Sequence, residues 1–179
     1  MSKEIWGPKA WHLIHNFSIR SNDNECMMVL INNFGYILPC QTCKKHYLYL
    51  INDIYPITNI NKTNIIHYMI DIHNIINDDL DKSVNLSYKE AIEVQKKTKN
   101  KDILYFMTKT YSQMDYATMS FFEFDKVFDF FVCFVKLYPT KNIHEKLNKL
   151  IQKKSFQEID TPKEFGKWIQ LYFSNDFFS

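Results

Sequence analysis

Two of the chain's four cysteines, Cys40 and Cys43, form a Cys-x-x-Cys that directly follows Pro39. Two thiols at this spacing can gain and lose a pair of electrons by breaking and forming a disulfide. Thiolates at the same spacing also bind metal ions, so the pair alone is compatible with redox chemistry and with a metal site. The residues on either side of the pair must distinguish these chemistries.

Cys40 is predicted to begin a helix that runs to about Ile54. The residues that recur on one side of this helix are Cys43, Tyr47, Leu50, Ile51 and Ile54. The free N–H groups and the dipole at a helix start lower the pKa of a thiol there and favour the reactive thiolate. Cys43 follows one turn later on the same face, so a disulfide between the two would be short-looped and partly exposed, which suits exchange with other thiols.

Two other interpretations of the pair stay open at this point. Cys40 and Cys43 can be buried thiols with no redox role. They can also bind zinc together with His46, although a fourth ligand would have to come from elsewhere in the chain.

Polar residues at helical spacing predict a ligand inside the fold. His73 and Asn77 are four residues apart on a helix expected over residues 62–81, so they project toward the same place. They share a stripe with three residues expected in the core, namely Ile66, Ile70 and Leu80. Two inward polar side chains need hydrogen-bond partners, which a polar ligand lodged among the helices would supply. A single one of them would be explained by an ordinary, satisfied core histidine.

Aromatic residues near the N-terminus offer a second wall for such a ligand. Trp11 and His15 are four residues apart, and Trp6 precedes them on the same predicted helix, residues 4–19. A flat aromatic ligand would stack well on indole rings. The simpler alternative is that the tryptophans only fill the core.

The elements that position these residues are predicted to be helices throughout. Three glycines and five prolines leave little room for the many tight turns of a β fold. Helices are expected over residues 4–19, 25–38, 40–54 and 62–81, and the capping box Ser87–Glu90 opens a fifth that ends in lysines. Five helices by about residue 98 predict a compact bundle, assigned as a domain over residues 1–99.

Residues 100–179 are predicted to be a further helical region whose function the sequence does not reveal. The capping box Ser120–Glu123 precedes a phenylalanine-rich helix that Pro139 stops, and Thr161-Pro162 marks another helix start. Charged residues interrupt the phenylalanines, which favours a buried or docking helix over a membrane span.

Composition argues against several classes of protein. The net charge is +2, with no clustered basic excess of the kind that nucleic acid binding requires. No stretch approaches the roughly 20 apolar residues of a membrane span. Residues 1–9 carry charge where a signal peptide has an apolar run, so a cytoplasmic protein is expected.

The two remaining cysteines, Cys26 and Cys133, are expected to be inert small hydrophobic residues. The alternative is a disulfide that ties the C-terminal region to the bundle, because nothing in the sequence sets the distance between them.

Three blocks of residues, in register, resemble the flavin-linked sulfhydryl oxidase family (Erv/ALR type), specifically its small forms from large DNA viruses. The blocks cover residues 6 to about 95 and read Trp6-Gly7-x-x-x-Trp11-x-x-x-His15, Pro39-Cys40-x-x-Cys43-x-x-His46-Tyr47, and His73-Asn74-x-x-Asn77-x-x-Leu80-x-Lys82. The Asn-, Ile- and Lys-rich composition fits an AT-rich viral genome.

The resemblance implies an all-α, five-helix bundle that holds FAD non-covalently beside a redox-active disulfide, with no metal. It implies that Cys43 approaches the flavin and that substrate thiols attack Cys40. It places eight further residues at flavin or nucleotide contacts: Trp6, Gly7, Trp11, His15, Tyr47, His73, Asn77 and Lys82. Electrons would pass from a thiol-containing protein or a small dithiol carrier to Cys40–Cys43, then to FAD, then to dioxygen, giving hydrogen peroxide.

The resemblance also implies a homodimer, in the host cytoplasm or the virion if the chain is viral. Two features depart from the family. The stretch 83–101 lacks the cysteine that many relatives use to pin the last bundle helix, and no shuttle cysteine pair is visible. These departures predict a minimal oxidase. The alternative function is a non-enzymatic helical interaction protein with a zinc or buried thiol site.

Overall fold

The computed structural model describes residues 2–57, 61–82, 85–97 and 100–173, which form helices with no strand among them. The first five α-helices are α1 (Lys3–Arg20), α2 (Asn24–Asn33), α3 (Gln41–Tyr49), α4 (Lys62–Asp79) and α5 (Tyr88–Lys97). The rest of the chain adds α6 (Asn100–Ser112), α7 (Phe121–Leu137), α8 (Lys141–Ile151), α9 (Lys154–Gln157) and α10 (Pro162–Tyr172). The all-α prediction is confirmed, and so is the helical C-terminal region.

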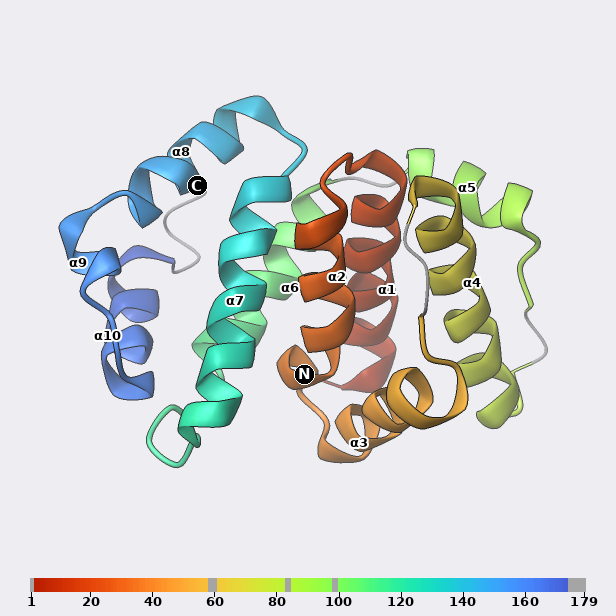
Figure 1. The fold of residues 1–179 in the computed structure, drawn as a ribbon, viewed down its shortest axis with the longest axis horizontal. Helices are drawn as coiled ribbons and strands as arrows, with labels where there is room; N and C mark the ends of the chain where they lie inside the picture. The colour runs from red at the N-terminus through yellow and green to blue at the C-terminus, as the bar shows by residue number, and fades with distance from the viewer. Residues whose placement is uncertain (1, 58–60, 83–84, 98–99, 174–179) are drawn as a thin grey trace.

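Helix α1 lies at the centre of the N-terminal half. It packs against α2, α4, α5 and α6, while α3 runs across the lower ends of the bundle helices (Figure 1). Because α1 has neighbours on several sides, its buried residues are spread around it and include Trp6, Leu13, Ile14 and Phe17. The residues of α1 that are expected to bind a ligand therefore lie on a helix whose position is fixed by packing against its neighbours.

Two segments that were each predicted as a single helix change from an α-helix to another helical form before they end. The predicted helix 25–38 is α-helical only to Asn33 and continues as the 3₁₀ turn Phe34–Ile37. This turn brings the backbone of Gly35 close to α3, where an added Cβ would lie 2.9 Å from Leu48 Cγ. The predicted helix 40–54 is α-helical to Tyr49 and then widens into the π-helical turn Leu50–Ile54. Sequence periodicity does not distinguish these local forms.

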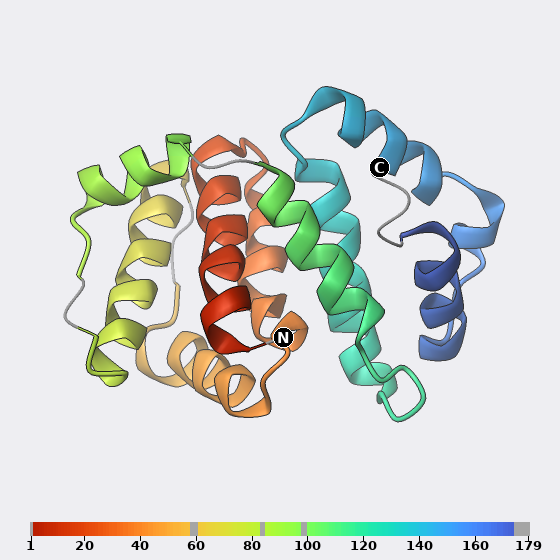
Figure 2. The same cartoon turned by 180° about the vertical axis from the view of Figure 1, so that it is seen from behind.

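The C-terminal region folds back onto the bundle. Helix α7 packs along α2 (Figure 1), and α6 packs along α1 (Figure 2). Beyond them, α8 packs on α7 (Figure 1), and α10 packs on α6 (Figure 2). One hydrophobic cluster accordingly contains buried side chains from Trp6 to Phe173.

The helices of this region that were predicted from the sequence, α7 and α10, are helices that begin with a side-chain cap. The predicted caps are present, because Ser120 Oγ accepts from Glu123 N at 3.2 Å and Thr161 Oγ1 accepts from Glu164 N at 3.3 Å. Helices α8 and α9 begin without a side-chain cap, and the prediction missed both, together with α6. The predicted domain boundary at residue 99 lies outside the described residues, so the division into residues 1–99 and 100–179 stays a prediction.

None of the described helices combines the length and the apolar character that crossing a membrane requires.

Candidate functional site

The Cys-x-x-Cys lies at the start of α3, as predicted. Cys40 is the N-cap residue, and its Sγ accepts a hydrogen bond from Cys43 N at 3.3 Å. The two cysteines form a disulfide with 5.2 Å between their Cα atoms, and both are half-buried. A thiolate at Cys40 would be stabilised by the N–H groups and the dipole of the same helix. The position of Cys40 therefore favours reactions in which its sulfur is released as a thiolate.

A cavity of about 520 Å³ opens beside Cys43, between α1, α3, α4 and α5. Eight of the residues predicted for the site line it: Trp6, Gly7, Trp11, Cys43, Tyr47, His73, Asn77 and Lys82. Two predicted site residues, Cys40 and His15, are not among the lining residues. The cavity has the size of a small-molecule or cofactor site. The cofactor contacts of these residues remain a prediction.

An aromatic wall joins α1 to α4 on one side of the cavity. The rings of Trp11 and His73 are stacked, with centroids 4.1 Å apart and an angle of 11° between the planes. His15 lies behind this pair, with its Nε2 3.0 Å from His73 Nδ1. His15 therefore acts on the cavity through the position of His73.

Both histidines are neutral at neutral pH. Burial, with smaller contributions from the nearby His73 and His12, lowers the pKa of His15 to about 3. Burial also lowers the pKa of His73 to about 4, with a smaller contribution from the charge of Lys82. A neutral imidazole carries one N–H, so in this pair one ring donates and the other accepts.

Tyr47 lines the cavity, but its hydroxyl stabilises the fold. Its hydroxyl donates to the backbone oxygen of Ile31 at 2.9 Å, which ties α3 to α2. Burial raises the pKa of Tyr47 well above its ordinary value, so the hydroxyl stays protonated. Its contribution to the cavity comes from its ring.

Polar groups on the cavity wall include one that the sequence analysis missed. Gln95 of α5 is buried and lines the cavity, yet its Oε1 has no hydrogen-bond partner among the described residues. Gln95 and Ala91 are the buried residues in the described part of α5, and they are four residues apart. A polar residue four positions after Ala91, on the inward stripe of α5, was the signal that could have identified it.

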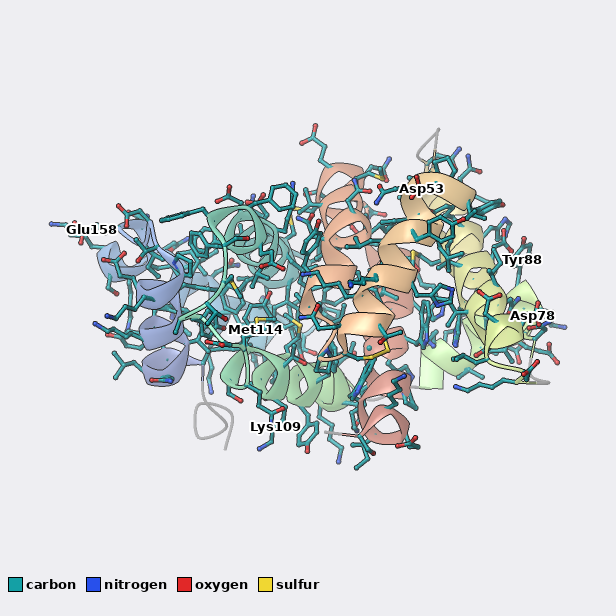
Figure 3. The ribbon with its side chains drawn as sticks, turned by 90° about the horizontal axis from the view of Figure 1, so that it is seen from below. Asp53, Asp78, Tyr88, Lys109, Met114 and Glu158 are labelled. Carbon is teal, nitrogen blue, oxygen red and sulfur yellow. A yellow bond between two sulfur atoms is a disulfide. The ribbon has the colours of Figure 1, made fainter. Side chains whose placement is uncertain are left out.

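Leu80 lies on the surface, although the sequence placed it in the core. It is 52% exposed, and it is the C-cap residue of α4 rather than a residue inside the helix. The chain turns immediately after it through Asp81, which has a φ of 52°. The helical stripe therefore ends before Leu80, and that core prediction was wrong. Asp78 and Tyr88 lie on this α4–α5 edge, at the opposite end of the molecule from Glu158 (Figure 3).

The atoms proposed for a zinc site have other partners in this structure. The sulfurs of Cys40 and Cys43 are bonded to each other, and His46 Nε2 lies 2.9 Å from Asp79 Oδ2. Across the described ranges, no cluster of three or more His, Cys, Asp and Glu side chains is placed to hold a metal ion.

A second cavity, of about 360 Å³, is lined by sequence neighbours of Cys40 and Cys43. Pro39, Gln41 and Lys44 contribute to it from the bundle, and Met114 and Glu123 contribute from the C-terminal region. Lys44 Nζ forms an ion pair with the carboxylate of Glu123 at the start of α7. The C-terminal region thus forms part of the surroundings of the disulfide, which its sequence did not indicate.

The comparisons with known proteins agree with this site. The model of the Erv1 / Alr family matches residues 8–101. The chain is 33% identical over 107 residues to a probable FAD-linked sulfhydryl oxidase of Acanthamoeba polyphaga mimivirus, a match that covers 55% of this chain and 73% of the relative. No solved structure matches. The family match contains α3 with its disulfide and most of the residues that line the larger cavity, and the chain belongs to the Erv1 / Alr family.

Proposed function

We propose that this chain is an FAD-linked thiol oxidase that forms disulfides in thiol substrates and passes the electrons to dioxygen. The observation that carries the proposal is that Cys43, one sulfur of a disulfide at a helix start, lines a cavity walled by Trp11 and His73. Membership of the Erv1 / Alr family and the name of the mimivirus relative support the same activity.

The residues of the cavity fit FAD. Flat rings of Trp6, Trp11 and His73 suit an aromatic ring system, and the ammonium groups of Lys3 and Lys82 suit a diphosphate. A Cβ added at Gly7 would meet no heavy atom within 4 Å, apart from chain neighbours and the backbone of its own helix, so space for a ligand exists at that point. The unpaired Oε1 of Gln95 is a buried acceptor that a donor group of a ligand would satisfy.

The two cysteines have different roles in the proposed reaction. Because Cys43 lines the cavity and Cys40 does not, we assign Cys40 as the sulfur that substrate attacks. A substrate thiolate bonds to Cys40 Sγ, the Cys40–Cys43 bond breaks, and Cys43 leaves as a thiolate. A second substrate thiolate then attacks the substrate sulfur and releases Cys40, which forms one disulfide in the substrate and leaves two reduced cysteines.

Bound FAD would supply the two-electron acceptor chemistry that restores the Cys40–Cys43 disulfide and delivers the electrons to dioxygen as hydrogen peroxide. The chain's own contribution is to hold Cys43 at the cavity wall and to stabilise the Cys40 thiolate at the start of α3. Neutral His15 and His73 add no positive charge to the wall on which the ligand would stack.

The partners follow from this chemistry. The substrate is a thiol-containing protein or a small dithiol carrier, and dioxygen is the terminal acceptor. We further propose a homodimer that acts in a host cytoplasm or a virion, with residues 1–99 as the oxidase domain and residues 100–179 as an extension that covers it.

An absorption spectrum of the purified protein, combined with an oxidation assay, tests the proposal. We expect a yellow protein whose flavin is released on denaturation, and which consumes dioxygen and produces peroxide with dithiothreitol as substrate. A colourless protein that contains zinc would instead support a non-enzymatic interaction protein.

A further inference from the structure

Two cysteines outside the proposed reaction meet where the C-terminal region packs on the bundle. Cys26 lies in the first turn of α2 and Cys133 lies in α7, and they are 6% and 7% exposed. Their sulfurs are 2.9 Å apart, although 107 residues separate them in sequence. Non-bonded carbon atoms, which are smaller than sulfur, rest about 3.5–4.0 Å apart. The distance is thus shorter than a comfortable contact between two thiols and lies toward the ~2.05 Å of a disulfide.

We propose that Cys26 and Cys133 form a second disulfide, which joins α2 of the family-matched part to α7 of the C-terminal region. The packing of these two helices is among the most extensive in the molecule, so the sulfurs are held together by the surrounding core. The start of α2 is also fixed, because Asp23 Oδ1 accepts a hydrogen bond from Cys26 N at 2.9 Å.

The surroundings of this pair indicate a structural bond and not a second reaction centre. Cys40 and Cys43 are half-buried and three positions apart in the sequence, and Cys43 lines the larger cavity. Cys26 and Cys133 are buried and line neither of the two cavities. A substrate thiol that reaches Cys40 therefore has no path to the second pair in the folded chain.

Formation of this bond requires an electron acceptor, and the chain's own activity supplies one. The Cys26 and Cys133 thiols lose two protons and two electrons and form one S–S bond. The Cys40–Cys43 disulfide of a second copy takes up the two electrons by exchange and becomes a dithiol, which its normal turnover reoxidises. This source of oxidant rests on the proposed function, whereas the position of the bond does not.

The burial of the two thiols indicates that the disulfide forms before α7 docks on α2. Desolvation raises the pKa of Cys26, and desolvation together with the neighbouring thiol raises the pKa of Cys133 far above its ordinary value. Thiolates are the reactive species, so both groups are poor nucleophiles once α7 is docked. The exchange consequently takes place while α7 is still away from α2, and the finished bond resists reduction in the folded chain.

Peptide mapping of the 179-residue chain tests the bond directly. The wild-type chain and a Cys40→Ser/Cys43→Ser variant are denatured in excess N-ethylmaleimide, digested without reductant and analysed by mass spectrometry. In the wild type we expect a linked peptide that contains Cys26 and Cys133. Alkylation of both cysteines in a wild-type sample that oxidises dithiothreitol would overturn the proposal without affecting the proposed function.

The Cys40→Ser/Cys43→Ser variant tests the source of the oxidant. After production under reducing conditions, its Cys26 and Cys133 should be alkylated, and the linked peptide should appear when it is refolded with catalytic amounts of wild-type protein. A variant that acquires the link equally well without the wild type would refute self-oxidation and leave the bond in place.

Stability provides a second readout that does not depend on mapping. In the Cys40→Ser/Cys43→Ser variant that has acquired the link by refolding with wild-type protein, reduction of the Cys26–Cys133 bond should lower the melting temperature by on the order of 5–15 °C. The matched control adds Cys26→Ser and Cys133→Ser to that variant, and reductant should leave its melting temperature unchanged.

Single substitutions distinguish a Cys26–Cys133 disulfide from two independent thiols. If the bond exists, Cys26→Ala and Cys133→Ala should each destabilise the oxidised chain about as much as the two together. Effects of the single substitutions that add up in the double variant would contradict the proposal.

Discussion

The imidazole of His15 on α1 and that of His73 on α4 are hydrogen-bonded to each other, with 3.0 Å between Nε2 and Nδ1. His73 in turn stacks on Trp11, so the three rings form one unit that connects two helices across the wall of the cavity. The hydrogen bond within this unit requires at least one of the two rings to be neutral, because two imidazolium rings offer each other no acceptor.

Acid should therefore destabilise the protein before its carboxylates titrate. The pKa values of about 3 and about 4 in the folded state lie below the ~6.5 of an unfolded histidine. Between these values the unfolded chain binds more protons, so the free energy of unfolding falls as the pH falls from about 7 to about 4. Each histidine contributes at most about 1.4 kcal/mol per pH unit.

Urea denaturation between pH 7 and pH 5 measures this effect. A His73→Asn variant should show a weaker pH dependence than the wild type. His67→Asn is the matched control, since His67 lies on the same helix but stacks on Tyr88, outside the cavity. Equal slopes in the wild type and His73→Asn would show that the pair does not govern acid stability.

Replacing either cysteine of the Cys-x-x-Cys should abolish thiol oxidation and leave a folded protein that binds flavin. The disulfide is the proposed route for electrons, whereas most of the cavity wall consists of other residues. Dioxygen consumption and the flavin spectrum of Cys40→Ser and Cys43→Ser check this expectation. Full activity in either variant is incompatible with the proposed reaction.

His73→Ala and Asn77→Ala should weaken FAD retention. Loss of one hydrogen-bond partner of a buried polar group costs about 1–3 kcal/mol, which corresponds to roughly one to two decades in affinity. Retention after dialysis, measured by flavin absorbance per chain, should be normal in a His67→Ala control. Stoichiometric FAD in both cavity variants, with only lower thermal stability, would identify His73 and Asn77 as structural residues.

Gly7→Ala should have opposite effects on the free chain and on FAD binding. Glycine inside a helix is less favourable than alanine by roughly 0.5–1 kcal/mol, and the new Cβ meets no neighbouring group outside its own helix. The flavin-free protein should therefore melt a few degrees higher, while the lost space at the cavity wall lowers FAD affinity. Thermal melts with and without added FAD test both effects, and a parallel rise in stability and affinity would argue against a ligand at Gly7.

Glu123→Gln should destabilise the packing of the C-terminal region beside the disulfide by about 1 kcal/mol, because it removes the charge that pairs with the mostly buried Lys44. Glu158→Gln is the matched control, since the Lys154–Glu158 pair is solvent-exposed and worth a few tenths of a kcal/mol. Chemical denaturation of both variants gives the comparison, and equal effects would mean that burial adds nothing to the Lys44–Glu123 pair.

The sequence predicted the parts of the site that depend on spacing within one helix. His73 and Asn77, like Trp11 and His15, were grouped correctly because residues four apart share a helix face. It did not predict contacts between helices such as the Lys44–Glu123 pair, and it left open whether Cys26 and Cys133 meet. Those contacts depend on how α7 docks on α2, for which periodicity within each helix contains no information.

The bundle and the C-terminal region share one hydrophobic core, so a shortened chain would expose part of that core. The family match ends at residue 101, which invites a shortened version with only the matched segment. Such a fragment would lose α6 and α7 and would present the apolar sides of α1 and α2 to water. Exposed apolar patches of this kind promote aggregation. The fragment should accumulate in inclusion bodies, and catalytic studies should use all 179 residues.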